Sequence, residues 1–70
     1  MKKIIKIAGM QCDKCASRVK DKLENIELVD KVNVSIEKKE AYIEFQKEID
    51  NEILKDVIDN LGYEVISIRG

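Results

Sequence analysis

The residues of this chain that could do chemistry are two cysteines, Cys12 and Cys15, which lie three positions apart in a sequence of 70 residues with no histidine and no proline. On a helix, side chains with this spacing lie on the same side, with Cβ atoms ~5–6 Å apart. Two thiolate–metal bonds of roughly 2.3 Å laid end to end span about that distance. The pair is therefore suited to hold one soft metal ion between two thiolates.

The number of ligands narrows the choice of ion. A structural zinc or iron–sulfur site needs four ligands, so this chain would need a partner chain to complete one. A thiol–disulfide redox function uses the same spacing, but the order of elements predicted below is wrong for a thioredoxin-type fold, and the cis-proline expected of that family is missing. Use of both cysteines as small apolar residues is a further alternative. Two soft thiolates alone favour a soft d¹⁰ ion, above all Cu(I).

The composition argues against several classes of function. The chain has 13 Lys plus Arg and 14 Asp plus Glu, which gives a net charge of −1, whereas nucleic-acid binders carry a basic surplus. No apolar run is long enough to span a membrane. Without histidine, base catalysis near neutral pH would need a strongly shifted group. We therefore expect no nucleic-acid partner, no membrane insertion and no enzymatic activity.

The organisation of the chain is simple. No linker or low-complexity run interrupts it, so we expect one domain over residues 1–70. The start is basic, but Lys6 breaks the apolar stretch that a signal peptide would need. We therefore expect a cytoplasmic protein, in which the thiols stay reduced. The initiator methionine favours a free protein over an excised domain.

Alternation of apolar and polar residues predicts four strands. They cover residues 2–8, 32–36, 41–45 and 65–68, and the charged turn 37–40 joins the second and third into a hairpin.

Spacings of three and four predict two helices, at 13–26 and 50–61. The apolar face of the first has Ala16, Val19, Leu23 and Ile26, and that of the second has Ile53, Leu54, Val57, Ile58 and Leu61. Gly62 follows the second helix, where a left-handed C-cap costs glycine nothing.

The order strand, helix, strand, strand, helix, strand predicts a ferredoxin-like α+β fold, βαββαβ, with a four-stranded antiparallel sheet and two helices on one face. In this fold Cys12 lies in the loop after the first strand and Cys15 in the first turn of the first helix. We expect the helix dipole, with help from Lys14, to lower the pKa values of the thiols.

The sequence resembles the heavy-metal-associated domain family over essentially all of its length. The resemblance rests on Gly9-Met10-x-Cys12-x-x-Cys15 after the first strand, on the βαββαβ order and on Gly62-Tyr63 after the second helix. The family includes cytosolic copper chaperones, the bacterial ones among them, and the N-terminal modules of heavy-metal P-type ATPases.

The resemblance implies a role for each residue of the motif. Cys12 and Cys15 would bind the metal, and Met10 would pack beneath the loop rather than serve as a ligand. Gly9 would let the chain turn out of the sheet. Tyr63 would lie near the loop and shield the copper or tune solvent access, although an amphipathic residue at a strand start is an equal reading of it.

Two departures from the family pattern are visible. Gln11 stands where Thr or Ser is common, and where many zinc, cadmium or lead transporters carry Asp, which favours copper. Leu28-Val29 stands where Gly-Val is usual, so the turn after the first helix is expected to differ.

The resulting hypothesis is a Cu(I) metallochaperone that transfers its ion by ligand exchange to a copper-transporting P-type ATPase or to a copper-responsive repressor. We expect a monomer without metal and a metal-bridged dimer at high copper. Three alternatives stay open: a domain excised from a heavy-metal ATPase, a relative that binds Zn(II) or Hg(II), and a thiol–disulfide redox protein.

Overall fold

The six predicted elements are present in the predicted order in the computed structural model, which describes residues 1–70. They are β1 (Lys2–Ala8), α1 (Asp13–Glu24), β2 (Val29–Ser35), β3 (Glu40–Phe45), α2 (Asn51–Asn60) and β4 (Glu64–Arg69).

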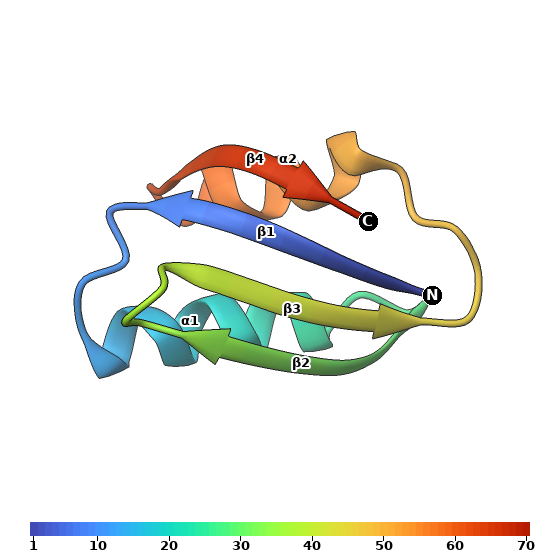
Figure 1. Cartoon of the computed structure of the whole chain (residues 1–70), viewed down its shortest axis with the longest axis horizontal. Helices are drawn as coiled ribbons and strands as arrows, with labels where there is room; N and C mark the ends of the chain where they lie inside the picture. Colours follow the sequence, from blue (N-terminus) through green and yellow to red (C-terminus); the bar gives the residue numbers. More distant parts are fainter.

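The strands form one antiparallel sheet in the order β2-β3-β1-β4. Both helices lie on the same side of it, so the sheet has one covered face and one open face (Figure 1). The predicted ferredoxin-like fold is therefore confirmed. No helix has the length and apolar character needed to cross a membrane.

The core lies between the covered face of the sheet and the helices. Alternate strand residues point into it, because successive side chains of a strand face opposite sides. Its fully buried large side chains are Ile5, Ile7, Met10, Val19, Leu23, Ile43, Ile49, Leu54 and Ile58. Met10 and Ile49 lie outside the predicted strands and helices; the family resemblance predicted burial of Met10, whereas the burial of Ile49, in the segment before α2, was not predicted.

Some boundaries and faces differ from the sequence prediction. α1 ends at Glu24 and β2 already begins at Val29, because Val29 N–H donates to the carbonyl of Ile26 in a tight turn. Ile53, predicted on the apolar face of α2, is 48% exposed, since consecutive helical residues differ by about 100° in direction and Leu54 faces the core. In β4, Ile66 is exposed where the pairing with β1 shifts register.

Different parts of the chain lie at the two ends of the molecule. The loop after β1, the β2–β3 turn and the α2–β4 connection gather at one end, and the N-terminus lies at the other (Figure 1).

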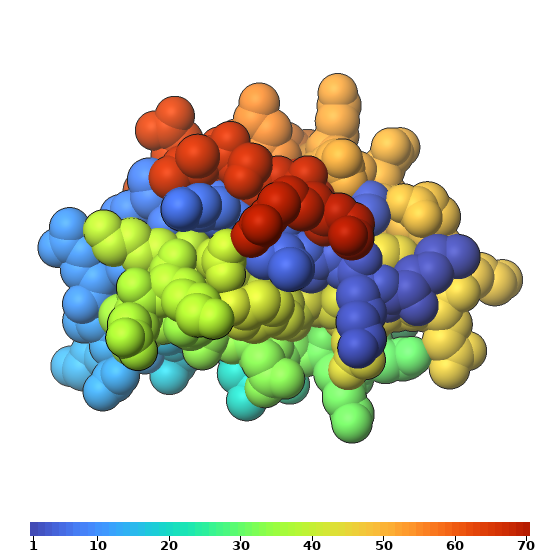
Figure 2. Space-filling model, in the orientation of Figure 1, coloured from blue at the N-terminus to red at the C-terminus, as the bar shows by residue number.

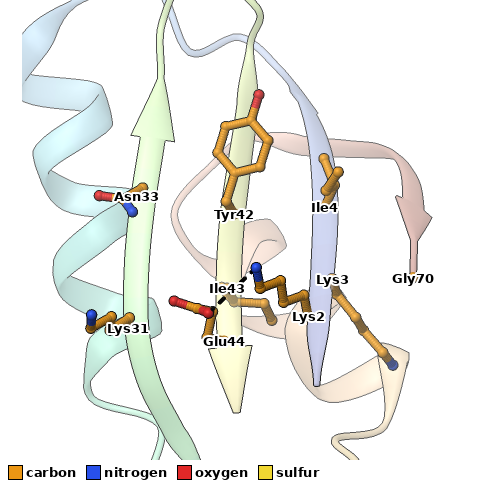
Figure 3. Close-up of a pocket in the computed structure, with 9 residues that line it drawn as sticks. All are labelled: Lys2, Lys3, Ile4, Lys31, Asn33, Tyr42, Ile43, Glu44 and Gly70. Carbon is orange, nitrogen blue, oxygen red and sulfur yellow. Dashed lines mark ion pairs between the residues drawn. The ribbon is translucent and has the colours of Figure 1, made fainter.

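At the N-terminal end, the open face has a shallow hollow of about 340 Å³. Figure 3 shows the Lys2 side chain directed at Glu44 across its floor, at 3.8 Å, while Lys3 points away. Figure 2 shows this open face with side chains from all four strands. Neither thiol lines the hollow. The loop after β1, which carries Cys12, lies at the opposite end (Figure 1).

Candidate metal centre

The loop between β1 and α1 places the two thiols. Cys12 is the N-cap residue of α1, with extended φ and ψ of −144° and 167°, and Cys15 follows in the first turn. Their connection is fixed by a hydrogen bond of 3.0 Å from Ala16 N–H to the carbonyl of Cys12. These are the positions that the sequence predicts for the pair.

Met10 and Tyr63 fix the same loop. Met10 is fully buried in the core, so its side chain packs rather than faces the surface. Gly9 has φ of +91°, a conformation that favours glycine. A Cβ atom at Gly9 would lie 3.3 Å from Cδ1 of Tyr63. The tyrosine ring therefore lies directly against the start of the loop, and a side chain at position 9 would crowd it.

The thiols lie closer together than a bound ion requires. Cys12 donates to Cys15 with 3.1 Å between the two Sγ atoms, whereas two bonds of roughly 2.3 Å in a line need ~4.6 Å. Cys12 is exposed and Cys15 is half-buried. Rotation of the exposed Cys12 side chain is therefore the simplest way to admit an ion.

Hydrogen bonding favours the thiolate of Cys15. The Tyr63 hydroxyl is the largest cause that lowers the pKa of Cys15 to about 7, followed by the Cys12 thiol and the backbone of Gln11. Conversely, Cys15 is the largest cause that raises the pKa of Tyr63. The sequence predicted a lowered thiol pKa from the helix dipole and Lys14, but a tyrosine hydroxyl has the largest effect here.

The chain offers no third side chain to the pair. Nowhere in residues 1–70 do three or more histidine, cysteine, aspartate or glutamate side chains gather at a distance that could hold a metal ion. The donor set at this end is therefore two thiols, which suits a soft ion of low coordination number and not a four-ligand site made by one chain.

A second polar cluster was missed by the sequence analysis. Glu40 accepts a hydrogen bond of 2.7 Å from the Tyr42 hydroxyl and forms an ion pair with Arg69. The hydrogen bond from Tyr42 is the main cause that lowers the pKa of Glu40. The only sequence signal was the placement of Glu40 and Tyr42 on one face of a strand. The partner in β4 could not be read from it.

Comparisons with known proteins find relatives both in sequence and among solved structures. Residues 4–64 match the model of the heavy-metal-associated domain family. The "Probable copper-exporting P-type ATPase" of Archaeoglobus fulgidus is 34% identical over 67 residues, which are 94% of this chain. A copper chaperone, CopZ, of Staphylococcus epidermidis is 30% identical over 64 residues.

The lengths of these relatives differ greatly. The alignment covers 8% of the archaeal ATPase and 94% of the staphylococcal chaperone. Among solved structures, a CopZ metallochaperone superposes with a TM-score of 0.88 at 28% identity, over 94% of this chain and 100% of that one.

Proposed function

Because this chain belongs to the heavy-metal-associated domain family, we propose that it carries Cu(I) between Cys12 and Cys15 and passes the ion to another protein with a thiol pair. The observation that carries the proposal is the reduced, surface thiol pair with 3.1 Å between sulfurs and no third ligand. Two soft thiolates retain Cu(I) in preference to harder ions.

Transfer proceeds by exchange of thiolates. A thiol of the acceptor loses its proton to solvent and binds the two-coordinate ion. Cys12 then leaves the ion and takes up a proton, because it is exposed at the helix start and can rotate. Cys15, supported by Tyr63, leaves last, when the second acceptor thiolate has bound. Copper stays Cu(I) throughout, and no covalent product forms, so the protein acts as a carrier and not as an enzyme.

The acceptor we propose is the metal-binding module of a copper-transporting P-type ATPase or a copper-responsive repressor. The first is supported by the similarity to a relative described as a copper-exporting ATPase. The carrier would act where thiols are kept reduced, as in the cytoplasm, since both of its cysteines must be free. A dimer that shares copper through four thiolates stays a prediction.

A second candidate function uses the same thiol exchange. The match to a small part of the archaeal ATPase supports a metal-binding module within a larger transporter. In that case Cys12 and Cys15 would receive the ion rather than deliver it. The thiol exchange described above applies in either direction.

The proposal is tested by anaerobic titration of the reduced protein against a coloured Cu(I) chelator, with Cys12→Ser and Cys15→Ser as variants. We expect one Cu(I) per chain, held more tightly than Zn(II), and loss of tight binding in both variants. Loaded protein mixed with a tagged thiol-pair domain should deliver copper faster than it releases copper to the chelator. Equal Cu(I) binding by the serine variants would refute the proposal.

A further inference from the structure

The segment between β3 and α2, residues 46–50, has few interactions of its own; we call it the strap. It passes around the N-terminal end of the molecule and belongs to no helix or strand (Figure 1). No backbone N–H of the strap donates to a backbone carbonyl. Its one buried side chain is that of Ile49, which is 1% exposed and belongs to the core. The strap therefore needs support from elsewhere to stay in place.

Lys3 of β1 gives that support. Its Nζ donates to the carbonyl of Ile49 at 2.8 Å and to Oδ1 of Asn51, and it forms an ion pair of 2.8 Å with Glu48. The same atom lies 5.8 Å from the centre of the Phe45 ring, within the range of a cation–π contact. One ammonium group thus contacts the strap and the residue on each side of it, and its side chain is only 12% exposed.

The preceding residue, Lys2, has different surroundings, because successive side chains of a strand face opposite sides of the sheet. Figure 3 shows Lys2 directed across the open face toward Glu44 and Lys3 directed away from it. The Lys2 side chain is 76% exposed and its ion pair is 3.8 Å long. Such exposed pairs contribute little to stability, whereas hydrogen bonds from a poorly exposed ammonium group are among the stronger ones.

The two ends of the strap are attached differently. Before it, the N–H of Phe45 donates to the carbonyl of Met1 at 2.9 Å, which continues the pairing of the sheet. After it, the N–H of Ile53 donates to the carbonyl of Asp50 at 3.1 Å, in the first turn of α2. Segments with few buried contacts open at a lower free energy cost than the core of a protein. The strap and the start of α2 can therefore detach while the sheet stays paired.

We propose that the strap is a latched opening unit. Lys3 is the latch that holds residues 46–50 over the N-terminal end of the core. When its ammonium group releases them, the strap and the first turn of α2 move out together and uncover the apolar ring of Phe45. The strap lies at the end opposite the thiols, so this device is independent of the proposed copper function.

Amide hydrogen exchange of the reduced, metal-free protein tests the proposal. The N–H of Ile53 reports on the strap, and that of Ile7, which donates to the carbonyl of Lys39 at 2.9 Å, reports on the sheet. Lys3→Met keeps the apolar stem and removes the ammonium group, so exchange at Ile53 should become about tenfold faster. Exchange at Ile7 should change much less. The matched control, Lys2→Met, makes the same substitution one residue earlier and should leave both rates nearly unchanged.

Limited digestion with trypsin gives a second measurement. Lys47 is an exposed residue of the strap, and cleavage after it follows the population of the open state when closing is fast. The Lys3→Met variant should be cut there about tenfold faster than the parent, as judged from the masses of the first fragments. The rate of Cys15 alkylation should be the same in both proteins, because the metal loop stays folded.

Three results would overturn the inference. Exchange at Ile53 could stay unchanged in Lys3→Met, or it could rise equally in Lys2→Met. An equal rise at Ile53 and Ile7 would show that Lys3 supports the whole fold and not a separate unit. If Lys3→Met does not fold, Asn51→Ala removes one of the latch contacts, and it should still accelerate exchange at Ile53 more than at Ile7.

Discussion

Cys15 and Glu40 each interact with a tyrosine hydroxyl, yet their surroundings differ. Tyr63 is the main cause of the lowered pKa of Cys15, and Tyr42 is the main cause of that of Glu40. The Glu40 carboxylate is completed by Arg69, and its side chain is only 12% exposed. Cys15 has an exposed thiol beside it instead. A tyrosine hydroxyl therefore supports a closed cluster at Glu40 and an accessible thiol pair at Cys15.

The two clusters lie in different parts of the fold. Glu40 is in β3 and Arg69 is in β4, and β1 lies between these strands in the sheet. Their ion pair thus ties the C-terminal strand across β1. Cys12 caps α1 and Cys15 lies in its first turn. The loop before α1 is at one end of the molecule (Figure 1), and there Cys12 is exposed.

The largest expected effect separates the two clusters by function. Cys15→Ser should reduce Cu(I) affinity by more than the roughly 10–100-fold that changes around a metal ligand cost, while the unfolding midpoint changes little. Glu40→Gln should lower the unfolding midpoint and leave the Cu(I) affinity unchanged. Chelator competition and thermal unfolding of both variants check this. A loss of copper binding in Glu40→Gln would mean that the clusters are not independent.

A smaller effect should follow from opening the closed cluster. Arg69→Gln leaves the Glu40 carboxylate with Tyr42 but without its cation, and unpaired charges of low exposure are costly. We expect the thermal midpoint to fall by several degrees. Lys2→Gln is the control, since its pair with Glu44 is exposed and 3.8 Å long and such pairs contribute about 0–1 kcal/mol. Equal shifts in both variants would show that Arg69 has no special role.

The fold could be predicted because each element has a local signal. Ile5 and Ile7 lie on either side of Lys6, Val19 and Leu23 repeat at helical spacing, and Cys12 precedes a helix. Ile66 illustrates the limit, because a register shift between neighbouring strands decides its exposure and is not a local property.

The site could be predicted only in part for the same reason. The cysteine pair and the nearby Tyr63 follow from sequence spacing and family resemblance. The effect of the Tyr63 hydroxyl on the pKa of Cys15 and the Glu40–Arg69 pair depend on residues 48 and 29 positions apart. Such contacts exist only when the sheet has formed.

Acid should affect the closed cluster before it unfolds the chain. The pKa of folded Glu40 is lower than its ordinary value of 4.5. Its stabilising contribution is therefore complete above that value and is lost as pH falls through the lowered pKa. Denaturant midpoints of the parent should drop more than those of Glu40→Gln as pH is lowered below 4.5. Parallel curves for the two proteins would argue against a folded-state shift.

The smallest effect should come from the open cluster. Alkylation of Cys15 by iodoacetamide should have its midpoint near pH 7, with slower reaction below it as the thiolate is protonated. Tyr63→Phe should move the midpoint upward and slow the reaction at pH 7 severalfold. Its effect on copper affinity should be modest, because both ligands remain. Tyr42→Phe is the control and should leave the Cys15 midpoint unchanged.

In the proposed carrier, Cys12 and Cys15 alone hold one Cu(I) ion. X-ray absorption of the copper-loaded monomer, at a concentration where no dimer forms, tests it most directly. We expect two sulfur neighbours around Cu(I) in the parent protein and the loss of one in Cys12→Ser. A nitrogen or oxygen neighbour in the parent, three or more sulfurs in the monomer, or an unchanged spectrum in Cys12→Ser would contradict it.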